Sequence, residues 1–233
     1  MILHPGFRER RVPTLSVVLA GLVLAVAPVI GSAGVTGSDP VVQPVHREAP
    51  DDPPAERPAT PPRGVISVGP IVARGEFESV QVNVDDNGNN IPGDAANEPS
   101  IAVDPNNPNI MAIGWRQFDS VNSNFRQAGW GYSQDGGQSW TFPGVLEPGV
   151  FRSDPVLDFD SEGTFYYNSL TQNFLFDTYI STDGGVTWGD PNPAFGGDKA
   201  WMAIDRTGGM GHGHLYLPWS TAAGCCGSRI FTR

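Results

Sequence analysis

Two short segments that are near copies of each other carry the most regular arrangement of reactive side chains in the sequence. They are Ser133-Gln-Asp-Gly-Gly-Gln-Ser-Trp140 and Ser181-Thr-Asp-Gly-Gly-Val-Thr-Trp188. Each places one carboxylate, Asp135 or Asp183, between two hydroxyl side chains, an arrangement that suits acid–base chemistry or cation binding. The alternative is structural, because an aspartate in a tight turn can accept several backbone N–H groups. We favour the structural interpretation.

Other residue types in the two segments also suit a tight turn between strands. In each segment a pair of glycines supplies the positive φ angles that such a turn needs. The first serine can bond across the loop, and the tryptophan can bury a large apolar surface between neighbouring sheets. We therefore expect a structural role for the following residues: Ser133, Asp135, Gly137, Trp140, Ser181, Asp183, Gly185 and Trp188.

An Asp/Asn-rich loop is the candidate metal site. Asp85, Asn87 and Asn89 offer oxygen ligands on alternate residues, as calcium loops do. The twelfth position counted from Asp85 is Ala96, where such a loop needs a bidentate glutamate. A plain turn is therefore the favoured alternative, and no cofactor other than calcium is expected.

For two further pairs of residues we prefer an interpretation without a metal site or a special bond. His212 and His214 could bind a transition metal, but without nearby Cys or carboxylate partners in the sequence a loop role is favoured. Cys225 and Cys226 are adjacent, so a disulfide between them would close a strained ring. Two thiols, or partners elsewhere, are the alternative.

The elements that position these residues recur along the chain. Apolar segments that end in an aspartate and a turn predict first strands at 99–104, 155–160 and 200–205. Second strands are predicted at 110–115, 164–168 and 214–219, and third strands at 129–132 and 177–180. Fourth strands are expected to begin at Trp140 and Trp188. Short strands, glycine-rich turns and the lack of a helical period predict an all-β fold.

The spacing of the repeat narrows the architecture further. The two near copies start 48 residues apart, about the length of a four-stranded β-propeller blade. The chain supplies two full blades and part of a third, so we expect it to be a fragment of a longer propeller. The predicted organisation is a signal peptide at 1–33, a proline-rich disordered linker at 34–68 and a partial propeller at 69–233.

Charge and the N-terminal composition restrict the partners and the location. A basic start, a short apolar run and small residues near Ala33 are typical of a secretory signal peptide. We therefore expect a secreted, periplasmic or extracellular protein that meets a membrane only if that segment is not cleaved. The formal net charge of −11 argues against nucleic acid as a partner, because phosphate backbones bind basic surfaces.

The repeated pattern Ser-x-Asp-x-Gly-x-Ser/Thr-Trp resembles the Asp-box, or BNR repeat, of sialidases and related propellers. The resemblance covers residues 98–233 and implies a sialidase-like propeller, usually with six blades. Such enzymes hold the substrate carboxylate with three arginines and use an aspartate acid/base and a tyrosine–glutamate nucleophile. Their early Arg-Ile-Pro motif is missing; the nearest match is the weak Phe151-Arg152-Ser153-Asp154-Pro155. No catalytic role is therefore assigned to any residue.

Charged residues that precede the first strands, or follow the second, should gather at the propeller face away from the Asp-boxes. These candidate ligand-binding residues are Glu98, Arg116, Arg152, Asp154, Asp198 and Lys199. The alternative is that they cap loops or form ion pairs between blades. We expect Trp115, Trp130 and Trp201 in the core rather than as sugar-stacking platforms. For Trp219 both alternatives, burial in the core and stacking on a sugar, stay open.

Two functions remain. The first is an exported sialidase-like protein of glycoside hydrolase type that acts on or binds glycoconjugates. The alternative is a non-catalytic Asp-box propeller that binds protein or glycan, because one fold serves many functions. Either way a carbohydrate or glycoprotein is the expected ligand.

Overall fold

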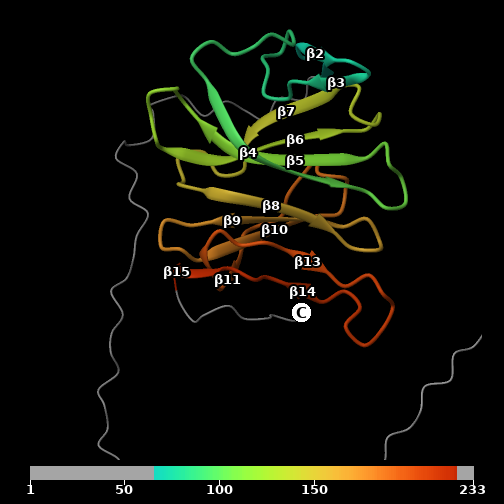
Figure 1. Cartoon of the computed structure of the whole chain (residues 1–233), viewed down its shortest axis with the longest axis vertical. Coiled ribbons are helices and arrows are strands. Elements are labelled where there is room, and N and C mark those ends of the chain that lie inside the picture. Colours follow the sequence, from blue (N-terminus) through green and yellow to red (C-terminus); the bar gives the residue numbers. More distant parts are fainter. Residues whose placement is uncertain (1–65, 225–233) are drawn as a thin grey trace, which may run out of the picture. The chain divides into compact units, whose positions relative to one another are not determined.

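A computed structural model describes residues 66–224 of the chain. The elements of this part are all strands, which confirms the predicted all-β class (Figure 1). Their bounds are β1 (Ile66–Ser67), β2 (Ile71–Arg74), β3 (Phe77–Val80), β4 (Ala95–Val103), β5 (Met111–Phe118), β6 (Arg126–Ser133), β7 (Trp140–Val145), β8 (Ser153–Phe159), β9 (Phe165–Leu170), β10 (Phe176–Ser181), β11 (Asn192–Ala194), β12 (Gly197–Asp198), β13 (Ala203–Ile204), β14 (Leu215–Tyr216) and β15 (Ser220–Gly224). Between residues 66 and 224 there is no helix long and apolar enough to cross a membrane.

Several expectations fall outside this range. The signal segment at 1–33, nearly all of the linker at 34–68, and both Cys225 and Cys226 lie outside the described residues. The last three residues of the expected linker do not: Ile66 and Ser67 pair with Thr141 and Trp140 at the edge of a sheet.

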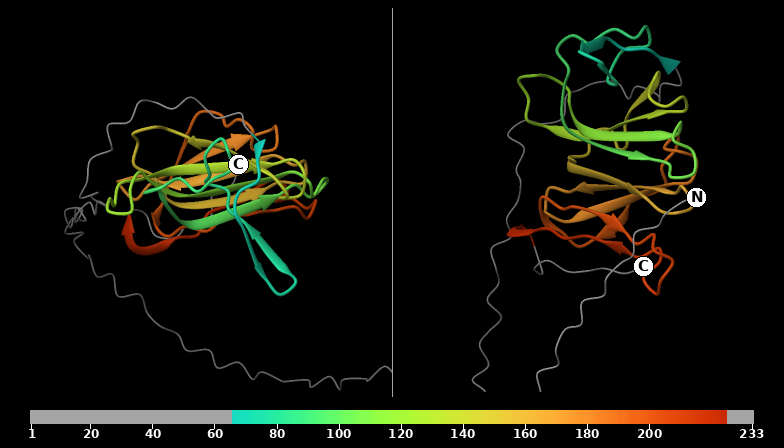
Figure 2. Two further views of the ribbon diagram at one scale, coloured as in Figure 1. Left: turned by 90° about the horizontal axis from the view of Figure 1, so that it is seen from above. Right: turned by 45° about the vertical axis from the view of Figure 1, so that its right-hand side comes forward.

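Two antiparallel sheets are built from strands that pair with their neighbours in the chain, except that β1 joins the first sheet beside β7. The first has the order β1-β7-β6-β5-β4 and the second the order β11-β10-β9-β8. The first two strands of the third repeat unit are each interrupted, which gives the pairs β13–β14 and β12–β15. A small hairpin, β2–β3, completes the described part; it projects from the sheets in Figure 2. The described residues do not close into a barrel or a ring of sheets.

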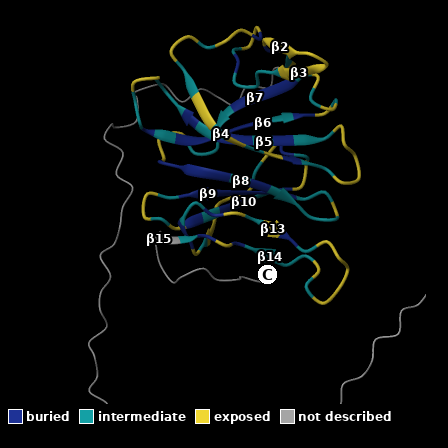
Figure 3. Cartoon of the chain, in the orientation of Figure 1, coloured by how far each residue is buried: buried dark blue, intermediate teal, exposed yellow. Residues whose placement is uncertain are grey.

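The main core lies between the first two sheets (Figure 3). Tyr167 is fully buried there, with its ring edge-on to Tyr179 at 6.2 Å and to Trp188 at 5.6 Å between centroids. Gly114 makes this packing possible, because a Cβ atom at that position would lie 2.3 Å from the ring of Tyr167. A second cluster, which includes Leu170, continues toward the third unit.

The strands predicted in the first two units are largely confirmed; those predicted at 200–205 and 214–219 in the third unit are present only in short pieces. β7 begins at Trp140 as expected, but β11 begins at Asn192, so the prediction of a strand start at Trp188 is wrong. Trp188 instead packs on Tyr167, while the N–H of Gly189 bonds the carbonyl of Ile180 and closes the turn.

The four tryptophans discussed above do not all lie in the core. Trp115, Trp130 and Trp219 are buried. Trp201 is 57 % exposed, so the expectation that it belongs to the core is wrong. It lies in the interruption of the third unit's first strand, where its N–H bonds the carbonyl of Pro218. The proline interrupts the paired strand, because it lacks the N–H of a regular ladder.

Candidate functional site

Each repeat unit has one residue with a left-handed backbone in its first strand. These are Glu98 (φ 52°), Asp154 (φ 44°) and Lys199 (φ 51°), each directly before the strand segment predicted from the sequence. For a residue that is not glycine this conformation costs about 1–2 kcal/mol. In β4 and β8 it coincides with a shift in strand register, a distortion that redirects side chains.

Polar contacts link these three residues, although they come from three different units. Glu98 accepts bonds through both carboxylate oxygens: Oε1 is 2.8 Å from Nη2 of Arg116, and Oε2 is 3.2 Å from Nζ of Lys199. The backbone N–H of Lys199 donates to Oδ2 of Asp154 at 3.2 Å. We call Glu98, Arg116, Asp154 and Lys199 the first-strand cluster. Four of the six predicted ligand-binding residues thus lie together.

The first-strand cluster combines a buried, hydrogen-bonded carboxylate with charged side chains that solvent can reach. Asp154 is buried, and its Oδ1 accepts from the hydroxyl of Ser153 at 2.9 Å. Side-chain exposure rises from 19 % for Arg116 to 34 % for Glu98 and 42 % for Lys199. Nε of Arg116 also donates to Oδ1 of Asn97 at 2.7 Å, which fixes the plane of its guanidinium. The site is therefore rigid at its base and open to solvent at Lys199.

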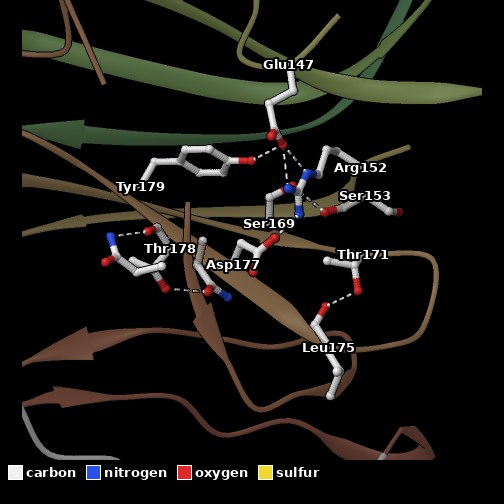
Figure 4. A network of polar contacts seen from close by, with 11 residues as sticks. Glu147, Arg152, Ser153, Ser169, Thr171, Leu175, Asp177, Thr178 and Tyr179 are labelled. Atoms are coloured by element: carbon white, nitrogen blue, oxygen red, sulfur yellow. Dashed lines mark hydrogen bonds and ion pairs between the residues drawn. The ribbon is translucent and has the colours of Figure 1, made fainter. Parts of the chain in front are cut away.

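Arg152 lies elsewhere, in a buried network between the first two sheets (Figure 4). Its guanidinium pairs with Glu147 and, at 2.6 Å, with Oδ2 of Asp177, while the hydroxyl of Tyr179 donates to Oε2 of Glu147 at 2.5 Å. Burial alone would lower the pKa of Arg152, but the bonds to the two carboxylates outweigh it and raise the pKa. This arrangement matches the structural alternative for Arg152, an ion pair between repeat units.

Asp198 makes no hydrogen bond or ion pair with the first-strand cluster in the described part of the chain. It lies on β12, opposite Ser220 of β15. Sequence reasoning missed Glu147, Asp177 and Tyr179, because their partner is Arg152 and no local spacing joins the four. For Glu147 and Asp177 the one sequence signal is their charge, opposite to that of Arg152; Glu147 comes from the first repeat unit and Asp177 from the second.

The near-copy segments at 133–140 and 181–188 form self-bonded turns. In the second, Oδ1 of Asp183 accepts from the hydroxyl of Ser181 at 2.8 Å and from the N–H of Thr187 at 2.9 Å, and Oδ2 accepts from the Thr187 hydroxyl. Burial would raise the pKa of Asp183, but the bonds from Thr187 and Ser181 lower it overall. Asp135 is bonded in the same way by Ser133 and Ser139.

These turns lie at the end of the strands opposite the first-strand cluster. The N–H of Gly136 bonds the carbonyl of Asn109, directly before the Ile110 that leads into β5, whereas Arg116 lies near the other end of β5. The tryptophan of the first turn closes it, since Nε1 of Trp140 donates to the carbonyl of Gly137 at 3.0 Å. The two aspartates are thus engaged in holding the backbone, away from the clustered charges.

A polar cleft of about 300 Å³ lies next to the C-terminal end of β8, at the turn that follows Phe159. Its lining includes Asp160, Glu162, His212 and His214. His212 bridges two units, with Nε2 3.2 Å from the hydroxyl of Ser161. This contact supports the loop role preferred for the histidines.

The Asp/Asn-rich loop is a turn that its own aspartate holds. Oδ1 of Asp85 accepts the backbone N–H groups of Asn87 and Asn89, both at 2.8 Å, and Gly88 adopts a φ of 76°. Among residues 66–224, no group of three or more His, Cys, Asp or Glu side chains is arranged to hold a metal ion. Calcium binding at Asp85 stays a prediction.

Comparison with known proteins gives no family. No protein-family model matches the chain, and no curated protein does. One solved structure that is similar is described as "Crystal structure of unknown function protein from Dyadobacter fermentans DSM 18053". It shares 15 % sequence identity with a TM-score of 0.38, and the match covers 54 % of this chain and half of that chain.

Proposed function

We propose that this protein is an exported, sialidase-like Asp-box propeller module that binds glycoconjugates through the first-strand cluster. The observation that carries the proposal is the meeting of Glu98, Asp154 and Lys199, each with a left-handed backbone, from three successive repeat units. Strained residues persist where the surroundings hold them, and they gather at binding and catalytic sites.

The propeller assignment is supported by the order of the strands. β4 to β7 and β8 to β11 are two successive antiparallel meanders, and a third unit starts in the same way. The Asp-box turns join the third and fourth strands, at the end of the sheets away from the charges. In a propeller the first strands lie nearest the central axis, so the first-strand cluster would face the axial opening.

The chemistry of the first-strand cluster suits sugar hydroxyl groups. A hydroxyl donates one hydrogen bond and accepts others, so it is best held by neighbouring donors and acceptors. Lys199 and Arg116 present N–H donors beside the Glu98 carboxylate. The acidic chain also argues against nucleic acid as the ligand.

The test uses the only lysine of the chain, Lys199, as a reporter. The 233-residue chain, reductively methylated with ¹³C-formaldehyde, gives one lysine side-chain signal besides that of the N-terminal amine. A glycan array identifies ligands, and titration of a bound glycan should shift the Lys199 signal. Lys199→Met should weaken binding, whereas Arg74→Met, the same change on the exposed hairpin, should not. A glycan that binds without shifting the Lys199 signal, and that binds Lys199→Met as well as the wild type, would refute the proposed site.

A glycosidase is the second candidate, and one observation favours it. Glu98 contacts the ammonium of Lys199 and Asp154 contacts its backbone N–H, so two carboxylates lie next to one residue, and most glycosidases use a pair of carboxylates. A panel of fluorogenic glycosides assayed across pH 4–7 tests this idea. Turnover that Glu98→Gln and Asp154→Asn each abolish would establish hydrolysis; without turnover only binding stands.

A further inference from the structure

We infer that the first-strand cluster selects uncharged sugars and excludes sugars that carry a carboxylate. This inference rests on the proposed function and names its ligand class. It follows from how the cationic side chains near the cluster are already bonded within the protein.

Three guanidinium groups, that of Arg116 in the first-strand cluster and those of Arg126 and Arg152 outside it, donate to protein acceptors. Arg116 donates to Asn97 and Glu98. Arg152 is bound between Glu147 and Asp177. A sugar carboxylate would bind best through two parallel bonds from an arginine, and it would have to displace one of these fixed groups.

Arg126 is engaged as well. Its Nε donates to the hydroxyl of Ser153 at 3.3 Å, its Nη1 donates to the carbonyl of Asn124 at 2.9 Å, and its guanidinium lies 4.8 Å from the ring centre of Phe151. Burial lowers the pKa of Arg126, against the opposing effect of Asp154. This arginine therefore supports the base of the first-strand cluster instead of facing a ligand.

Lys199 is the most exposed cation of the cluster, and it too has a carboxylate partner. Its Nζ lies 3.2 Å from Oε2 of Glu98, whose other oxygen is bound by Arg116. One carboxylate thus satisfies two cations, and Asp154 adds a second negative charge. The four side chains sum to zero charge, so they offer an anion no net attraction.

A neutral sugar meets no such obstacle. Each carboxylate oxygen of Glu98 can accept a further bond, and the ammonium of Lys199 has further N–H groups to donate. A hydroxyl can use both without displacing either. An added carboxylate would instead lie beside Glu98, and like charges placed together in an interface oppose binding. The formal charge of −11 on the whole chain opposes anions at longer range.

The experiment compares matched glycans on the full-length protein. For each neutral glycan bound on an array, calorimetry at 0.15 M salt measures its affinity and that of its sialylated or uronic-acid counterpart. The acidic member should bind at least about tenfold more weakly. Equal or tighter binding of the acidic member would overturn this inference while leaving the proposed function intact. An array without any bound glycan would overturn both.

A single substitution should reverse the preference. Glu98→Gln removes the carboxylate that neutralises Arg116 and Lys199, so the acidic member of each pair should gain affinity and the neutral member should lose some. Glu76→Gln makes the same charge change in the turn between β2 and β3 and should leave the preference as it is. If Glu98→Gln, shown to be folded by its melting curve, does not improve binding of the acidic member, the inference is wrong.

Salt dependence provides a second measurement that needs no variant. Affinity for neutral glycans should stay nearly constant between 0.05 and 0.5 M salt, because no ion pair forms on binding. A steep loss of affinity with salt would indicate that the ligand pairs with Lys199 or Arg116 as an anion, and would contradict the inference.

Discussion

The ammonium group of Lys199 lies 3.2 Å from Oε2 of Glu98, although 101 residues separate the two in the chain. Both residues have a left-handed backbone, at the same position of their repeat units. The contact joins the first sheet to the start of the third unit, next to Asp154 of the second sheet. Equivalent distortions in successive units therefore bring charges together that the sequence keeps far apart.

Asp135 and Asp183 should matter for stability and leave ligand affinity unchanged. Asp183→Ala removes the acceptor of bonds from Ser181 and Thr187, which should cost about 1–2 kcal/mol, as loss of a backbone-capping side chain does. Asp190→Ala, a control at an exposed aspartate in the same connection, should change little. Urea unfolding and calorimetry measure both quantities. An Asp183→Ala protein of normal stability that has lost glycan binding would place the 181–188 turn at the binding site instead.

A glycine in the same turn is expected to be still more sensitive. Gly185 has a φ of 83°, and an added Cβ atom would lie 2.6 Å from Cβ of Ala112. Gly185→Ala should therefore combine backbone strain with a steric overlap between sheets and cost about 2–4 kcal/mol. Gly208 has a φ of 73° with nothing within 4 Å of an added Cβ, so Gly208→Ala should cost only about 1 kcal/mol. Equal losses in thermal unfolding would show that the overlap is relieved.

Much of the fold could be predicted because its signals are local. The paired aspartate, glycines and tryptophan at 133–140 and 181–188 define turns whose bonds lie within eight residues. The alternation of apolar residues that follows defines the strands. The expectation for Trp201 was wrong because an apolar side chain shows only that burial would be favourable. Whether Trp201 is buried depends on what packs against the third unit, which the local sequence does not show.

The candidate site was only partly predictable from the sequence. Aligning the repeats placed Glu98, Asp154 and Lys199 at equivalent positions, which predicted that they gather at one face. It did not predict their left-handed backbones, since φ at a register shift depends on the paired strand. Nor did it separate Arg152 from the others, because its partners Glu147 and Asp177 come from different units.

Acid should weaken the network around Arg152. Burial alone would raise the pKa of Glu147, but the bonds from Tyr179 and Arg152 outweigh it, so the folded-state pKa is lowered. The stabilisation from Glu147 is then fully present above its unfolded pKa of about 4.3 and is lost as the pH falls through the folded value. Glu147→Gln should be less stable at pH 7, and the difference in melting temperature from the wild type should shrink between pH 5 and pH 3.

The control for this pH dependence is Glu162→Gln. The Glu162 side chain is exposed and makes no hydrogen bond or ion pair in the described part of the chain. Its melting temperature should follow the wild type at each pH. If the Glu147→Gln difference stayed constant down to pH 3, the carboxylate charge of Glu147 would not contribute to stability.

The left-handed backbone at Lys199 should impose a conflict between stability and binding. Glycine accepts a φ of 51° without strain, whereas alanine does not, so Lys199→Gly should be about 1 kcal/mol more stable than Lys199→Ala. Both remove the ammonium that pairs with Glu98, and both should bind glycan equally weakly. At Glu76, outside the residues with positive φ, alanine should be the more stable of the two replacements. Chemical denaturation of the four variants tests this. If Lys199→Gly is no more stable than Lys199→Ala, the backbone at position 199 is not strained and does not hold Lys199 toward Glu98. If Lys199→Gly is more stable, the protein tolerates backbone strain at the lysine that its proposed ligand would contact.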